Sequence, residues 1–208
     1  MSDTTKSRLV KLGADTLAGA LVELIQMSPE TQDMVERLLA SPEERVQRVR
    51  EALLEIKAME GQYEGDDVEE LADELGFVLD DIETSVEDPE IGVTLMAEFF
   101  ETDETIFEVC DDASGDLSDI FTEDARDLFT SFACRCSNRK HLADTLFDLT
   151  RQDPYGVRGA LIDNAWEFLD HQGLESLSQR FEALRQKEKG DNEAWHLERC
   201  AYSLADQL

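Results

Sequence analysis

The sequence predicts an all-α fold, and three features of its 208 residues support that class. Nearly every segment repeats its apolar residues with the 3.6-residue period of a helix. No run alternates apolar and polar residues as a half-buried strand does. Proline, glycine, asparagine and aspartate separate the periodic segments rather than interrupt them. We therefore expect about ten helices of roughly 10–20 residues.

Short loops of roughly 2–6 residues join these predicted helices, which favours antiparallel αα-hairpins. We expect the hairpins to form a helical-repeat stack of the TPR-like or HEAT-like kind, with an irregular helical bundle as the alternative. No strict repeat signature is visible. The chain is predicted to form a single α-helical domain over residues 1–208, with a soft division near 103–120.

The N-terminal helices are recognised by their caps. A first substantial helix carries the apolar residues of 17–25. Ser28-Pro29 and Ser41-Pro42 each combine a capping serine with a proline at the first helical position. Glu44 stands three residues after Ser41, as a capping box requires. The apolar residues of the two helices that follow are Met34, Val35 and Leu38, and then Val46, Val49, Leu53 and Ile56.

The clearest apolar stripe follows Gly65 and predicts a helix of about 20 residues, or about 30 Å. It consists of Val68, Leu71, Leu75, Val78, Leu79, Ile82 and Val86. Pro89 opens another helix through Phe100, and a shorter helix is expected near Ile106. Later helices are expected over 125–134, 142–149, 157–169, 174–184 and 194–204. In the last three of these, helical spacing favours the core for the aromatic residues Trp166, Phe168, Trp195 and Tyr202, with binding anchors as the alternative.

Acidic residues dominate the middle of the chain. The formal net charge is −30, from 19 Lys and Arg against 49 Asp and Glu. Residues 58–125 contain 25 acidic side chains and no Lys, Arg or His, whereas the remaining residues carry 24 acidic and 19 basic side chains. Direct nucleic-acid binding is therefore not expected, because phosphate contacts need a basic surface.

The helix of the clearest stripe carries the highest density of carboxylates. They are Asp66, Asp67, Glu69, Glu70, Asp73, Glu74, Asp80, Asp81 and Glu83. Those in the first turn complement the helix dipole, but like charges four residues apart repel by about 0.2–0.5 kcal/mol. We consider three interpretations: a solvated face that aids solubility, a docking surface for a basic protein or peptide, and mimicry of a nucleic acid.

Two other groups of residues are compatible with metal binding. The loop 110–119 has an aspartate-rich, calcium-loop character. Aligning its Gly115 with the invariant EF-hand glycine, however, puts Cys110 and Phe121 at ligand positions, so a helix-capping turn is the better interpretation. Cys134, Cys136, His196 and Cys200 offer four ligands for zinc, although Cys134 and Cys136 diverge by about 200° on a helix. The default is free thiols.

No motif of a known catalytic mechanism is present. The chain has no glycine-rich phosphate loop, no G-x-S-x-G and no H-E-x-x-H. We therefore expect no cofactor and lean toward a protein without catalytic activity. An enzyme or metal-dependent regulator that uses Cys134, Cys136, His196 and Cys200 is the alternative.

Four cysteines in 208 residues do not form a disulfide framework, and neither a signal peptide nor a transmembrane run is visible. A cytoplasmic protein is expected.

Several segments, taken in order, resemble an uncharacterised bacterial family of helical proteins, a domain of unknown function. They are Leu12-Gly13-Ala14 with 17–24, the helix 68–82 ending in Leu79-Asp80-Asp81-Ile82, the loop 111–116 leading to Ile120-Phe121, and 153–158 leading to Leu161-Ile162. The resemblance covers most of residues 6–185. It implies a helical repeat-like fold without an assigned activity, and similar proteins run longer, so this chain is expected to lack a C-terminal portion.

Together these observations predict a protein-interaction scaffold with an acidic face over 58–125.

Overall fold

The computed structural model describes residues 3–27, 31–32, 35–36, 39–188 and 190–208. The chain divides into two compact units, residues 1–45 and 46–208. The first unit contains α1 (Asp3–Val10) and α2 (Ala14–Ile25). Most of the helix expected after Ser28-Pro29, with Met34 and Leu38, lies outside the described residues. The predicted division near 103–120 lies within the second unit and stays a prediction.

The boundary between the units falls within α4 (Pro42–Lys57). The Glu44 backbone N–H donates to Ser41 Oγ at 3.2 Å, and the Ser41 N–H donates to Glu44 Oε2 at 2.8 Å. This reciprocal pair is the predicted capping box.

The second unit is entirely helical in the residues described, apart from one isolated bridge between Tyr63 and Cys110. Its elements after α4 are α5 (Asp66–Ser85), α6 (Pro89–Phe100), α7 (Asp103–Val109), α8 (Asp116–Asp119), the π-helix η1 (Ile120–Ala125), α9 (Arg126–Arg135), α10 (Arg139–Thr150), α11 (Gly159–Asp163), the 3-10 helix η2 (Ala165–Glu167), α12 (His171–Arg185) and α13 (Asp191–Asp206). The all-α prediction is confirmed.

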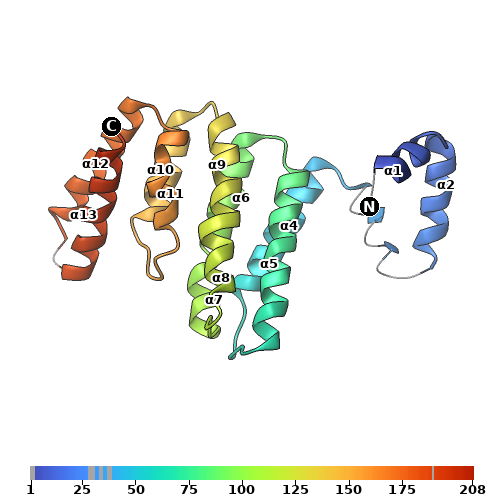
Figure 1. Ribbon diagram of the computed structural model, residues 1–208, viewed down its shortest axis with the longest axis horizontal. Coiled ribbons are helices and arrows are strands. Elements are labelled where there is room, and N and C mark those ends of the chain that lie inside the picture. Colours follow the sequence, from blue (N-terminus) through green and yellow to red (C-terminus); the bar gives the residue numbers. More distant parts are fainter. Residues whose placement is uncertain (1–2, 28–30, 33–34, 37–38, 189) are drawn as a thin grey trace. The chain divides into compact units, whose positions relative to one another are not determined.

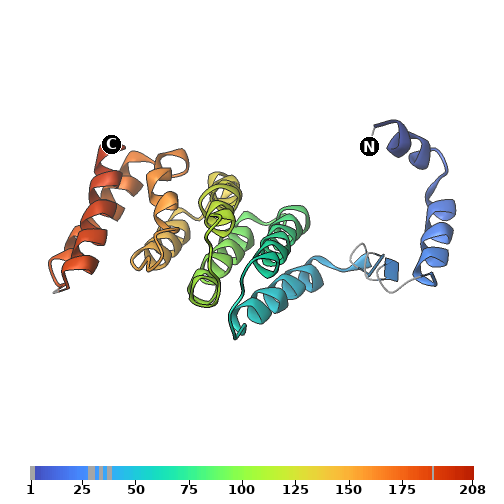
Figure 2. The ribbon, with the colours of Figure 1, turned by 60° about the horizontal axis from the view of Figure 1, so that its bottom comes forward.

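Many helices of the second unit pack against elements two or more places further along the chain as well as against the next one. α5 contacts α6, α8 and η1, α6 contacts α9 and α10, and α10 contacts α11 and α12. α12 and α13 form an αα-hairpin, and the series of helices can be followed in Figures 1 and 2. Their lengths differ widely, from 4 residues in α8 to 20 in α5. The TPR-like or HEAT-like repeat stays a prediction.

The core of this unit is rich in phenylalanine. The six phenylalanines that are at most 1% exposed are Phe99, Phe100, Phe121, Phe129, Phe132 and Phe181. The apolar stripe predicted for 68–86 is buried throughout and faces this core. α6 and α9 approach so closely that a Cβ atom at Gly92 would overlap the ring of Phe132. The core therefore anchors one face of α5 and leaves its acidic face outside.

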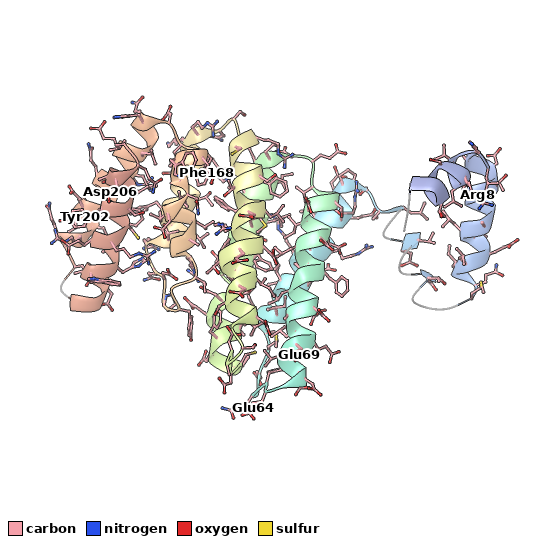
Figure 3. The ribbon with its side chains drawn as sticks, viewed as in Figure 1. Arg8, Glu64, Glu69, Phe168, Tyr202 and Asp206 are labelled. Atoms are coloured by element: carbon pink, nitrogen blue, oxygen red, sulfur yellow. The ribbon has the colours of Figure 1, made fainter. Side chains whose placement is uncertain are left out.

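Two sequence expectations about the C-terminal helices are wrong. The helix expected over 157–169 is only five residues of α-helix, because it ends at Asn164, whose side-chain N–H₂ donates to the Ala160 carbonyl at 3.1 Å. Of the aromatic residues assigned to the core, only Phe168 is buried. Trp166, Trp195 and Tyr202 are 59%, 64% and 63% exposed, and Figure 3 shows Tyr202 on the outer side of α13. Helical spacing groups such residues but does not say which face packs.

Candidate functional site

A groove of about 720 Å³ runs between α5 on one side and α8, η1 and α9 on the other. We call it the acidic groove. Its polar lining residues are Asp73, Asp80, Glu83, Asp116, Asp124, Asp127 and Ser131, and its other lining residues are Ala72, Gly76, Phe77, Leu79, Ile120 and Leu128. Six of the seven polar side chains are therefore carboxylates, three on each side.

The α5 side of the groove follows directly from the apolar period of this helix. Because Leu75, Val78 and Ile82 point into the core, Asp73, Asp80 and Glu83 are left on the exposed face. Phe77 lies among them and is 66% exposed. An exposed aromatic ring between carboxylates is a feature that burial in the core does not explain.

The opposite side is built by a capped loop and a π-helix. Asp112 accepts hydrogen bonds from the backbone N–H groups of Leu117 and Ser118 at 3.1 and 3.0 Å, and from Ser118 Oγ at 2.6 Å. The aspartate-rich loop is thus a helix-capping turn, as interpreted from the sequence. The Asp112 carboxylate caps the first turn of α8. η1 follows and contributes Ile120 and Asp124 to the groove.

The predicted interaction residues divide between two sides of α5. Asp73, Asp80 and Glu83 line the acidic groove. Asp67, Glu70 and Glu74 line a second, smaller cavity of about 250 Å³, together with Glu55, Ile56, Met59, Tyr63 and Leu71. Asp66 and Glu69 are exposed in the first turn, and Asp81 is half-buried. Figure 3 shows Glu64 and Glu69 at the end where α5 begins.

Sequence reasoning missed the opposite side of the groove. Asp116 and Asp124 belong to the acidic stretch 58–125, and Asp127 lies just beyond it. The stretch was a usable signal, but nothing local indicated that these three carboxylates face α5.

Cations from outside the acidic stretch pair with α6 and α7. The pairs are Arg50–Glu98 at 3.2 Å, Lys57–Glu101 at 2.8 Å, Arg158–Asp103 at 2.5 Å and Arg158–Glu104 at 3.8 Å. Of the carboxylates that line the groove, Asp127 pairs with Arg126 at 2.7 Å. Within the described ranges, no cation forms an ion pair with Asp73, Asp80 or Glu83. The negative charge of the groove is therefore largely uncompensated.

The Asp103–Arg158 pair is buried, with side chains 0% and 7% exposed. Arg158 Nε and Nη2 donate to the two carboxylate oxygens at 2.8 and 2.5 Å. Burial raises the pKa of the Asp103 carboxyl, and the hydrogen bonds from Arg158 oppose that shift only in part. Burial acts to lower the pKa of Arg158, but its hydrogen bonds to Asp103 outweigh this and raise the pKa. The pair ties α7 to the start of α11.

Only two of the four proposed zinc ligands come together. His196 Nε2 lies 3.7 Å from Cys200 Sγ and 2.7 Å from the Thr150 carbonyl oxygen. Cys134 Sγ contacts the Glu167 carbonyl and Cys136 Sγ the Asn138 carbonyl, at 3.5 and 3.8 Å. In the part of the chain that the structure describes, no three His, Cys, Asp or Glu side chains are grouped to hold a metal ion. The structure therefore provides no support for the four-ligand site.

Burial also determines the state of the thiols. It raises the pKa of Cys200 to about 12, so this thiol is protonated at neutral pH. Burial, helped by the charge of Asp112, raises the pKa of Cys110. Neither thiol has the lowered pKa of a reactive cysteine.

The fold and the groove define an all-helical protein with a carboxylate-lined groove on its second unit. Residues 2–205 match the model of the Family of unknown function (DUF6880), and the chain belongs to this family. The resemblance to a helical family of unknown function is thereby confirmed. A search of the curated proteins and a search of the solved structures each found no match. Among the helices of the described residues, none is long and apolar enough to cross a bilayer.

Proposed function

We propose that this protein is a non-catalytic interaction scaffold and that its acidic groove docks a basic protein or peptide. The observation that carries the proposal is the groove itself: six carboxylates and an exposed phenylalanine, with no cation paired to Asp73, Asp80 or Glu83 among the described residues. A solvated face that served solubility alone would not need the exposed ring of Phe77, since exposed aromatic surface lowers solubility.

Charge and shape together select the partner class. Complementary potentials speed association and fix orientation, and a groove lined by carboxylates repels nucleic acid. The mimicry of a nucleic acid would also use acidic side chains, but the exposed ring of Phe77 among them has no counterpart in a phosphate backbone. The free cysteines fit the reducing cytoplasm, and the proposal places the protein there.

Site-specific photo-crosslinking in the native cells tests the proposal. Phe77→benzoylphenylalanine puts the reactive group in the groove, and Tyr202→benzoylphenylalanine is the matched control, because Tyr202 is equally exposed on α13. We expect a crosslinked protein with a basic surface from position 77 and not from position 202.

Charge-neutralising variants then test whether the carboxylates of the groove are responsible for the crosslink. Each exposed ion pair contributes about 0.2–1 kcal/mol, so D73N/D80N/E83Q should weaken the complex by up to about 3 kcal/mol, or roughly a hundredfold. The control E175Q/E182Q/D206N removes the same charge from α12 and α13. A crosslink from position 77 that survives D73N/D80N/E83Q unchanged would contradict the proposal.

A further inference from the structure

Building on the proposed function, we infer that the occupant of the acidic groove is an α-helix of the partner, with an apolar stripe flanked on both sides by Lys and Arg. The lining has an order by exposure: its six carboxylates are exposed, whereas Ile120 and Leu128 are half-buried. Asp73, Asp80 and Glu83 stand on the α5 side, and Asp116, Asp124 and Asp127 on the other. Phe77 is exposed on α5, between Asp73 and Asp80 along the helix, and Ile120 and Leu128 belong to the opposite side. A helix that is apolar on one stripe and basic on both flanks matches this order.

The hydrogen-bonding character of the lining favours a helix over an extended peptide. Carboxylates only accept hydrogen bonds, and Ser131 carries the one hydroxyl among the thirteen lining residues. Since α5, η1 and α9 are helical, most of their backbone groups already bond within the helices. An extended peptide would bring carbonyl groups into a groove with almost no donors. A helix satisfies its own backbone and presents only side chains.

The spacing along α5 fits a helix that lies alongside it. Asp73, Phe77 and Asp80 recur at intervals of four and three residues and so share one face. Asp73 and Asp80 are two turns apart, about 10.5 Å along the axis. Cations two turns apart on a partner helix have the same separation. The volume of about 720 Å³ is large enough for several side chains, since pockets for ligands occupy about 300–1,000 Å³.

The π-helix η1 is an independent sign that this side of the groove is specialised. π-helices are rare and often stand at functional sites. η1 (Ile120–Ala125) supplies both an apolar and an acidic side chain, Ile120 and Asp124, to the lining. The carboxylates are spread along the two sides, and no three are grouped to hold a metal ion within the described ranges. Distributed charge suits a partner with several cations rather than one ion.

The test uses a synthetic peptide of about 18 residues, or five turns. It carries Leu at helical spacing with Lys on both flanks. One control permutes the same residues so that no apolar stripe forms, and a second places proline at the centre to break the helix. Affinity is measured by fluorescence anisotropy, and helix formation on binding by circular dichroism.

We expect the amphipathic peptide to bind about tenfold more tightly than either control and to gain helix on binding, because neither control can present an apolar stripe on a helix. An aromatic anchor contributes strongly to such interfaces. F77S should therefore weaken binding of the amphipathic peptide about tenfold. L54S, at an apolar position of α4 that is similarly exposed, should leave it unchanged. Both substitutions are at exposed positions, so their melting temperatures should stay near that of the wild type.

The outcomes separate this inference from the proposed function. If the proline peptide binds as tightly as the helical one, and D73N/D80N/E83Q weakens both, the helical occupant is wrong and acidic docking stands. If none of the peptides binds, the inference also fails, and crosslinking from position 77 decides the proposed function. Binding without a gain of helix would overturn the inference as well.

Discussion

The protein uses aspartate in opposite ways in two regions of its second unit. Asp103 is fully buried and accepts two hydrogen bonds from Arg158, a residue 55 positions away. Asp80 is exposed in the acidic groove, with no ion pair among the described residues. Water stabilises an exposed carboxylate, whereas a buried one needs a partner. Arg50, Lys57 and Arg158 pair with carboxylates of the α6–α7 region. Under the proposed function, the unpaired charge of Asp80 is available to an external partner.

Removing the buried charge should have the largest effect. D103N leaves the buried Arg158 guanidinium with only the exposed Glu104 carboxylate, 3.8 Å away, as a paired counter-charge, so we expect a loss of up to about 3–5 kcal/mol in the free energy of unfolding. Urea denaturation followed by circular dichroism measures it. E101Q is the control, because the Lys57–Glu101 pair is partly exposed and is expected to contribute about 1 kcal/mol or less. Equal stability of D103N and the wild type would show that the pair does not tie α7 to α11.

The next effect concerns a second buried group, Cys200. Its pKa is raised from 9.0 to about 12, so between these pH values the native state keeps a proton that the unfolded chain loses. The stabilisation is therefore complete below the unfolded pKa and is lost as pH rises toward the folded pKa, by up to about 4 kcal/mol.

Urea denaturation at increasing alkaline pH checks this, with C200A as the comparison. The wild type should lose more stability over the range than C200A. Alkylation at neutral pH is a second check, in which the exposed Cys134 should react well before Cys200. Fast alkylation of native Cys200 would mean that it is not buried as described.

Removing groove charges should change the free energy of unfolding in the opposite direction from D103N. D73N/D80N/E83Q relieves like-charge repulsion along α5, for example between Glu69 and Asp73, and should stabilise the chain by about 0.5–1.5 kcal/mol. E175Q/E182Q/D206N should change stability by less than that. A destabilised D73N/D80N/E83Q would indicate that these carboxylates have structural partners.

The smallest expected effect is that of salt. Screening of the same repulsion should raise the melting temperature by about 1–3 °C between ~0.05 M and ~0.5 M sodium chloride. The increase should be smaller in D73N/D80N/E83Q and unchanged in E175Q/E182Q/D206N. The same increase in all three proteins would assign the salt effect to the whole surface rather than to the groove.

The sequence by itself determined the helical class, the capping box at Ser41, the apolar stripe of α5 and the acidic stretch 58–125. The first three features depend on residues within one or two turns of each other, because helical period and capping are local, and the fourth is a matter of composition. Half of the acidic groove lies on a helix that could be predicted in the same way, since Asp73 and Asp80 are on the face of α5 opposite to its stripe and Glu83 is at the edge of the stripe beside Leu79.

Only the tertiary structure decided which elements meet. It placed Asp116, Asp124 and Asp127 opposite α5, paired Asp103 with Arg158, separated Cys134 and Cys136 from His196, and left Trp195 and Tyr202 outside the core. A periodic pattern states that one face of a helix packs, but the neighbour that covers this face is set by side-chain fit between distant segments. The groove forms where α5 lies beside α8, η1 and α9, so no local sequence pattern indicated its α8–α9 side.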